Sequence, residues 1–132
     1  MQSQFNVQTT AHSQLIDITR DVQTLVTQSG IRDGIATVFI PHTTAAVTIN
    51  ENADPTVQSD MLQQLEKMVP WNQPFYRHSE GNSSAHLKAS MLGFSEQALI
   101  KDGRLVLGTW QAIYFCEFDG PRRRQAIVRV SQ

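Results

Sequence analysis

Cysteine is nearly absent from this sequence, and long apolar runs and an excess of charge are absent altogether. Its 132 residues include one cysteine, which excludes an internal disulfide and a cysteine-based zinc cluster. The formal net charge of −1 predicts no general attraction to nucleic acid or to an anionic membrane. No stretch approaches the ~18 consecutive apolar residues of a membrane span, and residues 1–6 do not resemble a signal peptide. We therefore expect a cytoplasmic protein with no nucleic-acid or membrane partner.

The common phosphate-loop and zinc-protease motifs are also missing, so no standard motif identifies a nucleotide or metal site. Apolar residues make up 40% of the chain and charged residues 17%, which is typical of a globular protein. There is no internal repeat and no low-complexity segment. The length and composition predict a single domain over residues 1–132, with a hydrophobic core.

Two main helices are predicted from apolar residues that recur with a helical period. The first spans residues 19–29, where Thr19 can cap the start and Gly30 can adopt the left-handed conformation that ends helices. The second spans residues 55–69 and begins at Asp54-Pro55, with the aspartate as N-cap and the proline in the first helical position.

The remaining elements are a short helix and a series of strands. Residues 85–92 predict the short helix, and the long loop before it, residues 71–84, is either functional or flexible. Residues 111–118 are apolar on both faces, as in a central strand. The other strands are expected at residues 4–10, 15–18, 35–40, 45–50, 98–101, 104–108 and 125–130. This uneven order predicts an α+β fold rather than a regular βαβ array.

The segment from His42 to Pro55 concentrates polar residues around one of these strands. His42 precedes the strand and Glu51 follows it. Nine extended residues would separate the two side chains by about 30 Å, so they cannot form one site within a flat strand. A bend after His42, a neighbouring strand or a second subunit must bring the site partners of His42 and Glu51 together.

Several polar residues are candidates for chemistry, and each has a plainer alternative. His42 and His86 lie where an imidazole can project into a cavity, or else they are hydrogen-bonded structural residues. Glu51 and Glu117 lie two residues after the apolar strand residues Ile49 and Phe115, on the same side of their strands. They are either general bases or metal ligands, or strand-end charges in water. The run Arg122–Arg124 is either a phosphate clamp or a solvated face.

Four ordered segments of the chain resemble the YjbQ family, whose small bacterial and archaeal members are classed with secondary thiamine-phosphate synthases. They are residues 42–57, 86–93, 103–111 and 117–124, and they contain the motifs HTTA, NENADPTV, HLKASMLG, GRLVLGTWQ and EFDGPRRR. The resemblance implies an α+β subunit with mixed β-sheets that assembles as a homotrimer. It also implies polar pockets near the subunit boundaries.

The resemblance also implies which residues form the pocket. The expected catalytic residues are His42, Glu51, His86 and Glu117, and the expected substrate-binding residues are Thr43, Asn52, Asp60 and Arg124. Some family members carry a further histidine two residues before the one that matches His86. Here that position is Ser84, which counts against a three-histidine metal site. His42 and His86 remain the candidate ligands of a divalent cofactor, magnesium or zinc.

The activity implied by the resemblance is weak thiamine-phosphate synthesis, a transferase reaction on phosphorylated small molecules. The ring nitrogen of a thiazole phosphate attacks the methylene carbon of a pyrimidine pyrophosphate, and pyrophosphate departs. This reaction needs stabilised leaving-group charge and two aligned partners. Two other functions stay open: a non-catalytic trimer that binds a metal or small anion, and a trimer whose polar motifs form interface hydrogen bonds. The sequence leaves open whether the protein is an enzyme.

Overall fold

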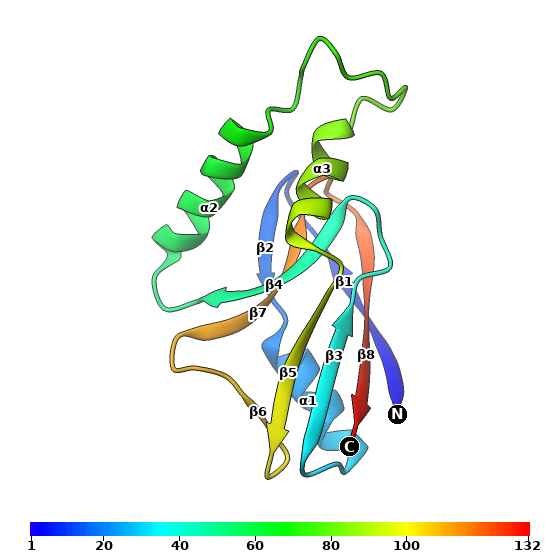
Figure 1. Ribbon diagram of the computed structural model, residues 1–132, viewed down its shortest axis with the longest axis vertical. Coiled ribbons are helices and arrows are strands. Elements are labelled where there is room, and N and C mark those ends of the chain that lie inside the picture. The colour runs from blue at the N-terminus through cyan, green and yellow to red at the C-terminus, as the bar shows by residue number, and fades with distance from the viewer.

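The computed structural model describes all 132 residues and forms an α+β fold, as predicted (Figure 1). The elements follow in the order β1 (Gln2–Gln8), β2 (Gln14–Asp17), α1 (Thr19–Ser29), β3 (Gly34–Phe39), β4 (Ala45–Glu51), α2 (Pro55–Met68), α3 (Ser83–Leu92), β5 (Ser95–Lys101), β6 (Arg104–Val106), β7 (Gln111–Glu117) and β8 (Arg123–Ser131). No helix is long and apolar enough to cross a lipid bilayer.

The strands form a five-stranded sheet in the order β1-β8-β3-β5-β6 and a three-stranded sheet in the order β2-β7-β4. Every strand pairing is antiparallel, so the expectation of mixed sheets was wrong. The hairpin between β5 and β6 turns at Asp102 and Gly103, where φ is positive at both residues, as a tight turn of this type requires.

Strand β7 joins the two hydrophobic clusters because its side chains alternate between the two faces of its sheet. Ile113 and Phe115 belong to the larger cluster, which fills the space between α1 and the five-stranded sheet. Tyr114 and Cys116 belong to a smaller cluster, in which α3 packs on the opposite face. The prediction of a central strand buried on both faces is confirmed for residues 112–117.

Two of the three predicted caps of α1 and α2 form as expected, and the third, at the start of α1, does not. Asp54 accepts a hydrogen bond from the Thr56 N–H at 2.9 Å, and Gly30 has φ of 72°, as expected for these two caps. Thr19 is not the N-cap, because its hydroxyl accepts a hydrogen bond from the Ile113 N–H of β7 at 2.9 Å. Asp17 instead accepts the Thr19 N–H, so a tertiary contact displaced the predicted cap.

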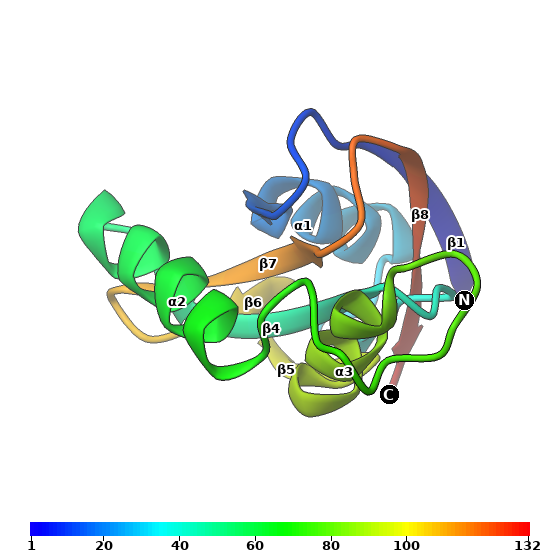
Figure 2. The same cartoon turned by 90° about the horizontal axis from the view of Figure 1, so that it is seen from above.

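Helix α2 lies at the side of the molecule and buries none of its residues completely (Figure 2). Its apolar residues Leu62 and Leu65 pack on the smaller cluster. Its polar contacts include an ion pair from Glu66 to the buried Lys88 of α3. Gln58 also donates hydrogen bonds to the Glu51 carbonyl oxygen and to the Tyr114 hydroxyl. The helix is therefore attached along one edge only.

Candidate functional site

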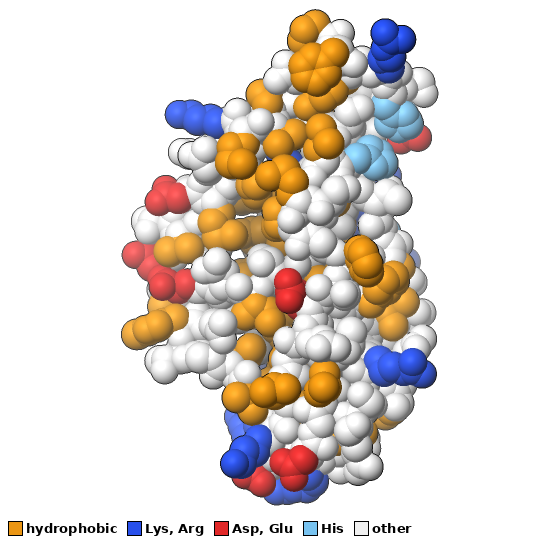
Figure 3. Space-filling view, in the orientation of Figure 1, with side chains coloured by type: hydrophobic (Ala, Val, Ile, Leu, Met, Phe, Trp, Pro, Cys, Tyr) orange, Lys and Arg blue, Asp and Glu red, His pale blue; other side chains and the backbone are white.

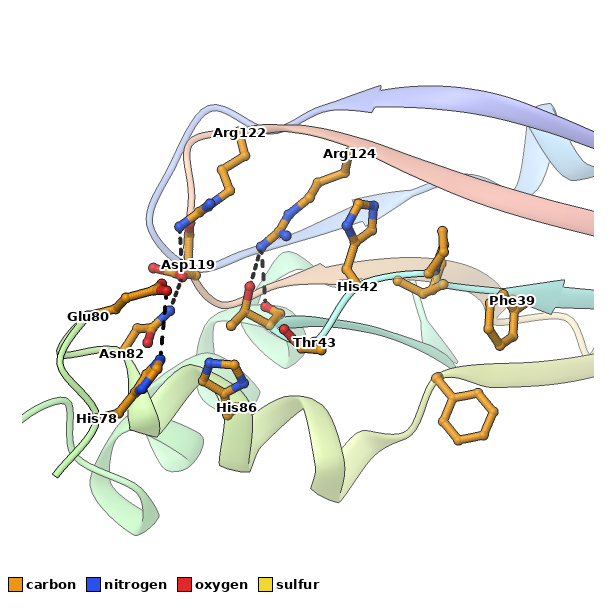
Figure 4. Close-up of a pocket in the computed structure, with 14 residues that line it drawn as sticks. Phe39, His42, Thr43, His78, Glu80, Asn82, His86, Asp119, Arg122 and Arg124 are labelled. Carbon is orange, nitrogen blue, oxygen red and sulfur yellow. Dashed lines mark hydrogen bonds and ion pairs between the residues drawn. The ribbon is translucent and has the colours of Figure 1, made fainter. Parts of the chain in front are cut away.

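A polar hollow of about 790 Å³ opens where the first half of α3 faces the turn between β7 and β8 (Figure 4). The segment between β3 and β4 forms a third wall, and the loop before α3 forms the rim. The lining residues are Phe39, Ile40, Pro41, His42, Thr43, Thr44, His78, Glu80, Asn82, His86, Phe94, Asp119, Arg122 and Arg124. A hollow of this size is typical of small-molecule sites.

Beneath the hollow, Glu117 forms a buried ion pair with Arg124. Glu117 Oε1 accepts hydrogen bonds from Arg124 Nε at 2.8 Å and from the Thr9 hydroxyl at 2.9 Å. Its Oε2 accepts from Arg124 Nη2 and from the Asp119 N–H. Burial acts to raise the pKa of Glu117, but these hydrogen bonds and the Arg124 charge outweigh burial and lower it. Glu117 is therefore an ionised anchor with no oxygen free for a substrate proton.

The anchored guanidinium of Arg124 has donors left over. Its Nη2 also donates to the Thr44 hydroxyl at 2.8 Å, whereas its Nη1 makes no hydrogen bond within the chain. Arg122 lies beside it, held by Asp119 through the backbone oxygen at 2.7 Å and through Oδ2 at 2.9 Å. Two arginines thus line one wall of the hollow, and the spare N–H groups of Arg124 can bind an anion.

His42 holds the end of a strand as well as lining the hollow. Its Nε2 accepts a hydrogen bond from the Gln125 N–H at 2.9 Å, two residues beyond the last β3–β8 pair. Burial first, and the neighbouring Arg124 charge second, lower the pKa of His42. The ring is therefore neutral near pH 7, with its proton on Nδ1, which is the nitrogen left for a ligand.

His86 lies in the first half of α3 and contacts His78 of the rim loop, with ring centroids 5.4 Å apart. His78 Nε2 is also 3.9 Å from Glu80 Oε1. No group of three or more His, Cys, Asp or Glu side chains is arranged to hold a metal ion. Since His42 Nε2 is already occupied, the residues of this chain alone do not fit a complete zinc site.

Of the expected site residues, the hollow brings together His42, Thr43, His86 and Arg124, with Glu117 beneath them. The others, Glu51, Asn52 and Asp60, lie elsewhere.

Glu51 and Glu117 lie at opposite ends of the three-stranded sheet because β4 and β7 run antiparallel. Glu51 pairs with Gln111, whereas Glu117 pairs with Ala45. Six residues of strand separate the two carboxylates by about 20 Å. Near Glu51, the Asn52 amide donates to Asp17 Oδ2 at 3.2 Å. Asp60 is exposed on α2. Within one subunit, these three residues do not reach the hollow. Only the hollow of a neighbouring subunit would be open to them.

Asn82, Asp119 and Glu80 line the hollow but were not among the expected site residues. Asn82 donates to Asp119 Oδ2 at 2.8 Å across 37 residues, and a contact of that range leaves no local pattern. Two local signals existed: Asn82 immediately precedes a helix, and the Asp119-Gly120-Pro121 turn follows Glu117 directly.

The fold and the hollow define a small α+β protein with an arginine-lined polar pocket. Residues 3–132 match the model of the family described as UPF0047 protein YjbQ-like. The UPF0047 protein YugU of Bacillus subtilis is 49% identical over 124 residues, which cover 94% of each chain. A UPF0047 protein of Methanocaldococcus jannaschii is 47% identical and covers 96% of this chain and 91% of its own.

A solved structure agrees with this assignment. An uncharacterized conserved protein of Clostridium acetobutylicum, at 52% identity, superposes with a TM-score of 0.96 over 98% of this chain and 99% of its own. The chain belongs to the YjbQ-like UPF0047 family. It is a conserved family of unknown function, so the thiamine-phosphate synthase activity implied by the sequence resemblance stays a proposal.

Proposed function

We propose that this protein binds a small phosphorylated molecule in the hollow between α3 and the β7–β8 turn. The observation that carries the proposal is the buried Arg124, held by Glu117 while its Nη1 remains unpaired at the wall. Arg122 adds a second guanidinium, and the N-terminal end of α3 lies at the same hollow. Guanidinium forks match phosphate oxygens, and helix N-termini favour negative charge.

Calorimetric titration with inorganic phosphate and pyrophosphate tests this binding. Arg122→Ala is the informative variant because Arg122 is half-exposed, and the Asp119 carboxylate that it leaves keeps the hydrogen bond from Asn82 Nδ2. We expect it to weaken pyrophosphate binding roughly tenfold, as the loss of a charge-assisted hydrogen bond implies. Arg32→Ala, at the exposed Arg32–Asp102 pair, is the matched control and should leave binding unchanged. Absence of binding by the unmodified protein would refute the proposal.

The reaction we propose for the site is thiamine-phosphate synthesis, in line with the family resemblance. A thiazole nitrogen forms a bond to the pyrimidine methylene carbon while the bond from that carbon to pyrophosphate oxygen breaks. The step transfers no proton, so it does not require a free general base. An anchored Glu117 is compatible with it, and Arg124, Arg122 and neutral His42 can stabilise the departing pyrophosphate.

Incubation with thiazole phosphate and pyrimidine pyrophosphate tests the activity, with thiamine phosphate and released pyrophosphate both measured. Turnover should fall in Arg122→Ala and persist in Arg32→Ala. Pyrophosphate binding without any product would leave the site as an anion-binding pocket and refute the transferase activity.

A non-catalytic protein that binds an anion or a metal is the second candidate. It is favoured over any enzyme that needs a general base, because both Glu117 oxygens and His42 Nε2 already accept hydrogen bonds within the chain. A magnesium or zinc ion held by His42 and His86 needs further ligands from the anion or from another subunit. Metal analysis after purification without added metal tests this candidate; a metal-free protein that binds neither phosphate nor pyrophosphate contradicts it.

We also propose that the subunit assembles as a homotrimer and acts in the cytoplasm. Exposed apolar side chains support assembly, and several gather over α3, β5 and β6 (Figure 3). We name this set the apolar stripe: Phe39, Leu87, Met91, Phe94, Leu99 and Val106. Phe39 and Phe94 also line the hollow, so a subunit on the stripe would border the site. Light scattering on the purified protein measures the subunit number.

A further inference from the structure

The side chain of Asn82 contains an unpaired buried acceptor next to the proposed anion site. Asn82 is only 5% exposed, and its Oδ1 is the one buried side-chain polar atom without a hydrogen bond. The same side chain lines the hollow with Arg122 and Arg124 (Figure 4). Nearly all buried polar atoms in proteins are hydrogen-bonded, so an exception beside a pocket indicates a missing donor.

The orientation of the amide is set by its neighbour. Asn82 Nδ2 donates to Asp119 Oδ2 at 2.8 Å, and Arg122 Nη2 donates to the same oxygen at 2.9 Å. Rotating the amide by 180° would place Oδ1 against the Asp119 carboxylate, where two acceptors repel each other. Oδ1 therefore remains the end of the amide without a partner.

The Asn82 side chain also lacks the hydrogen bond that an N-cap residue normally makes. It is the N-cap of α3, where an asparagine oxygen usually accepts a backbone N–H of the first helical turn. No such side-chain bond forms here, because Asp119 holds the amide in another direction. The acceptor is thus kept free at the cost of a helix cap, which points to a role in binding.

We propose that Asn82 Oδ1 accepts a hydrogen bond from a hydroxyl or ammonium group of the bound anion. Asn82 then selects phosphomonoesters that carry such a donor a few bonds from the phosphate. The short distance between the ligand's donor and its phosphate follows from Asp119. One Asp119 oxygen accepts hydrogen bonds from both Asn82 and Arg122, which keeps Oδ1 close to the arginines. This inference rests on the proposed anion binding. It specifies that the ligand carries a hydrogen-bond donor in addition to its phosphate.

Three phosphomonoesters of similar size test the selection by calorimetry on the intact protein. Ethyl phosphate has no donor on its chain, 2-hydroxyethyl phosphate has a hydroxyl, and 2-aminoethyl phosphate has an ammonium. We expect the unmodified protein to bind one or both donor-bearing esters roughly tenfold more tightly than ethyl phosphate, the effect of one hydrogen bond. The ester preferred shows whether the donor is a hydroxyl or an ammonium.

Asn82→Ala should lose this preference while it still binds ethyl phosphate. Asn72→Ala, at an exposed asparagine that does not line the hollow, is the matched control and should keep the preference. If Asn82→Ala fails to fold, a crystal structure of the unmodified protein with the preferred ester decides the matter. The ester's donor should then lie within hydrogen-bond distance of Oδ1; a water molecule there instead overturns the proposal.

The remaining outcomes separate this inference from the proposed function. Equal affinities for the three esters, or a preference that persists in Asn82→Ala, refute the role of Asn82 while anion binding stands. Failure of phosphate, pyrophosphate and all three esters to bind refutes both.

Discussion

Arg124 and Glu117 form an ion pair in which the arginine is 5% exposed and the glutamate is fully buried. Charged groups seldom leave water to this extent unless both are paired and hydrogen-bonded. Here the pair fixes the guanidinium that faces the hollow, and Thr9 and Thr44 complete its hydrogen bonds. The pair therefore connects the stability of the fold with the electrostatics of the candidate site.

Removing the carboxylate should destabilise the protein strongly. Glu117→Ala leaves Arg124 buried without a counter-charge, and the loss of one partner of a buried pair costs about 3–5 kcal/mol. Urea denaturation should show this loss, and Glu80→Ala on the exposed rim should not. The double variant Glu117→Met with Arg124→Leu should be more stable than Glu117→Ala, because it leaves no unpaired charge. An unfolding midpoint unchanged in Glu117→Ala would contradict this account.

The lowered pKa of His42 should make folding stability depend on pH. In the unfolded chain the imidazole has its ordinary pKa of 6.5, but in the folded protein burial and the Arg124 charge lower the pKa, so the ring protonates only at lower pH. As pH falls below that value, the unfolded state takes up the proton first, so stability should decrease until the folded pKa is passed. The charges that act on His42 are those of Arg124, Glu117 and Arg122. All three are retained in every variant compared, so a difference between variants comes from His42 itself.

Urea midpoints between pH 7.5 and 5.5 measure this dependence. In His42→Gln, an amide oxygen can accept the Gln125 N–H at any pH, so this variant should lose part of the decrease. His12→Gln replaces an exposed histidine outside the hollow and serves as the control. Parallel curves for His42→Gln and the unmodified protein would show that His42 does not carry the effect.

Gly120 should not tolerate a side chain, because the buried network closes around it. A Cβ atom there would lie 2.3 Å from the Ala11 carbonyl oxygen and 2.8 Å from Glu117 Cγ. We expect Gly120→Ala to cost about 1–3 kcal/mol, as overpacking does elsewhere. The control is Gly108→Ala, where the nearest atoms to the new Cβ belong to the flexible Gln111 side chain, at 3.2 Å and beyond. Equal unfolding midpoints for the two variants would contradict the packing around Gly120.

The local sequence was sufficient where a structural feature depends on neighbouring residues. Asp54-Pro55 starts α2 because the cap and the fixed proline φ act within one turn. The two-sided apolar pattern of residues 112–117 likewise identified β7 as central. Thr19 failed as a cap because the Ile113 N–H, 94 residues away in sequence, occupies its hydroxyl.

The candidate site was predicted only in part because its contacts are long-range. Whether Glu51 and Glu117 meet depends on the direction of β4 against β7, which neither strand's own sequence specifies. Asn82 and Asp119 were missed for the same reason. His42, His86 and the run Arg122–Arg124 were candidates from their local positions, and the family motifs then assigned His42, His86 and Arg124 to one pocket.

The apolar stripe is the surface through which we expect the subunits to assemble. Leu87 and Met91 are four residues apart on α3 and so share one helix face, and Phe94 follows with its ring 5.6 Å from that of Phe39. Met91 is 52% exposed, so Met91→Lys should leave the isolated subunit folded. A lysine in a packed apolar interface must lose its hydration without a partner, which costs several kcal/mol.

Met91→Lys should therefore convert the proposed trimer to subunits of 14.8 kDa, as measured by light scattering. The matched control, Gln28→Lys on the exposed side of α1, adds the same charge away from the stripe. Circular dichroism should confirm that both variants keep their secondary structure. A trimer that survives Met91→Lys would place the interface on another surface, and α2 would then be the next surface to test, because none of its residues is fully buried within the subunit.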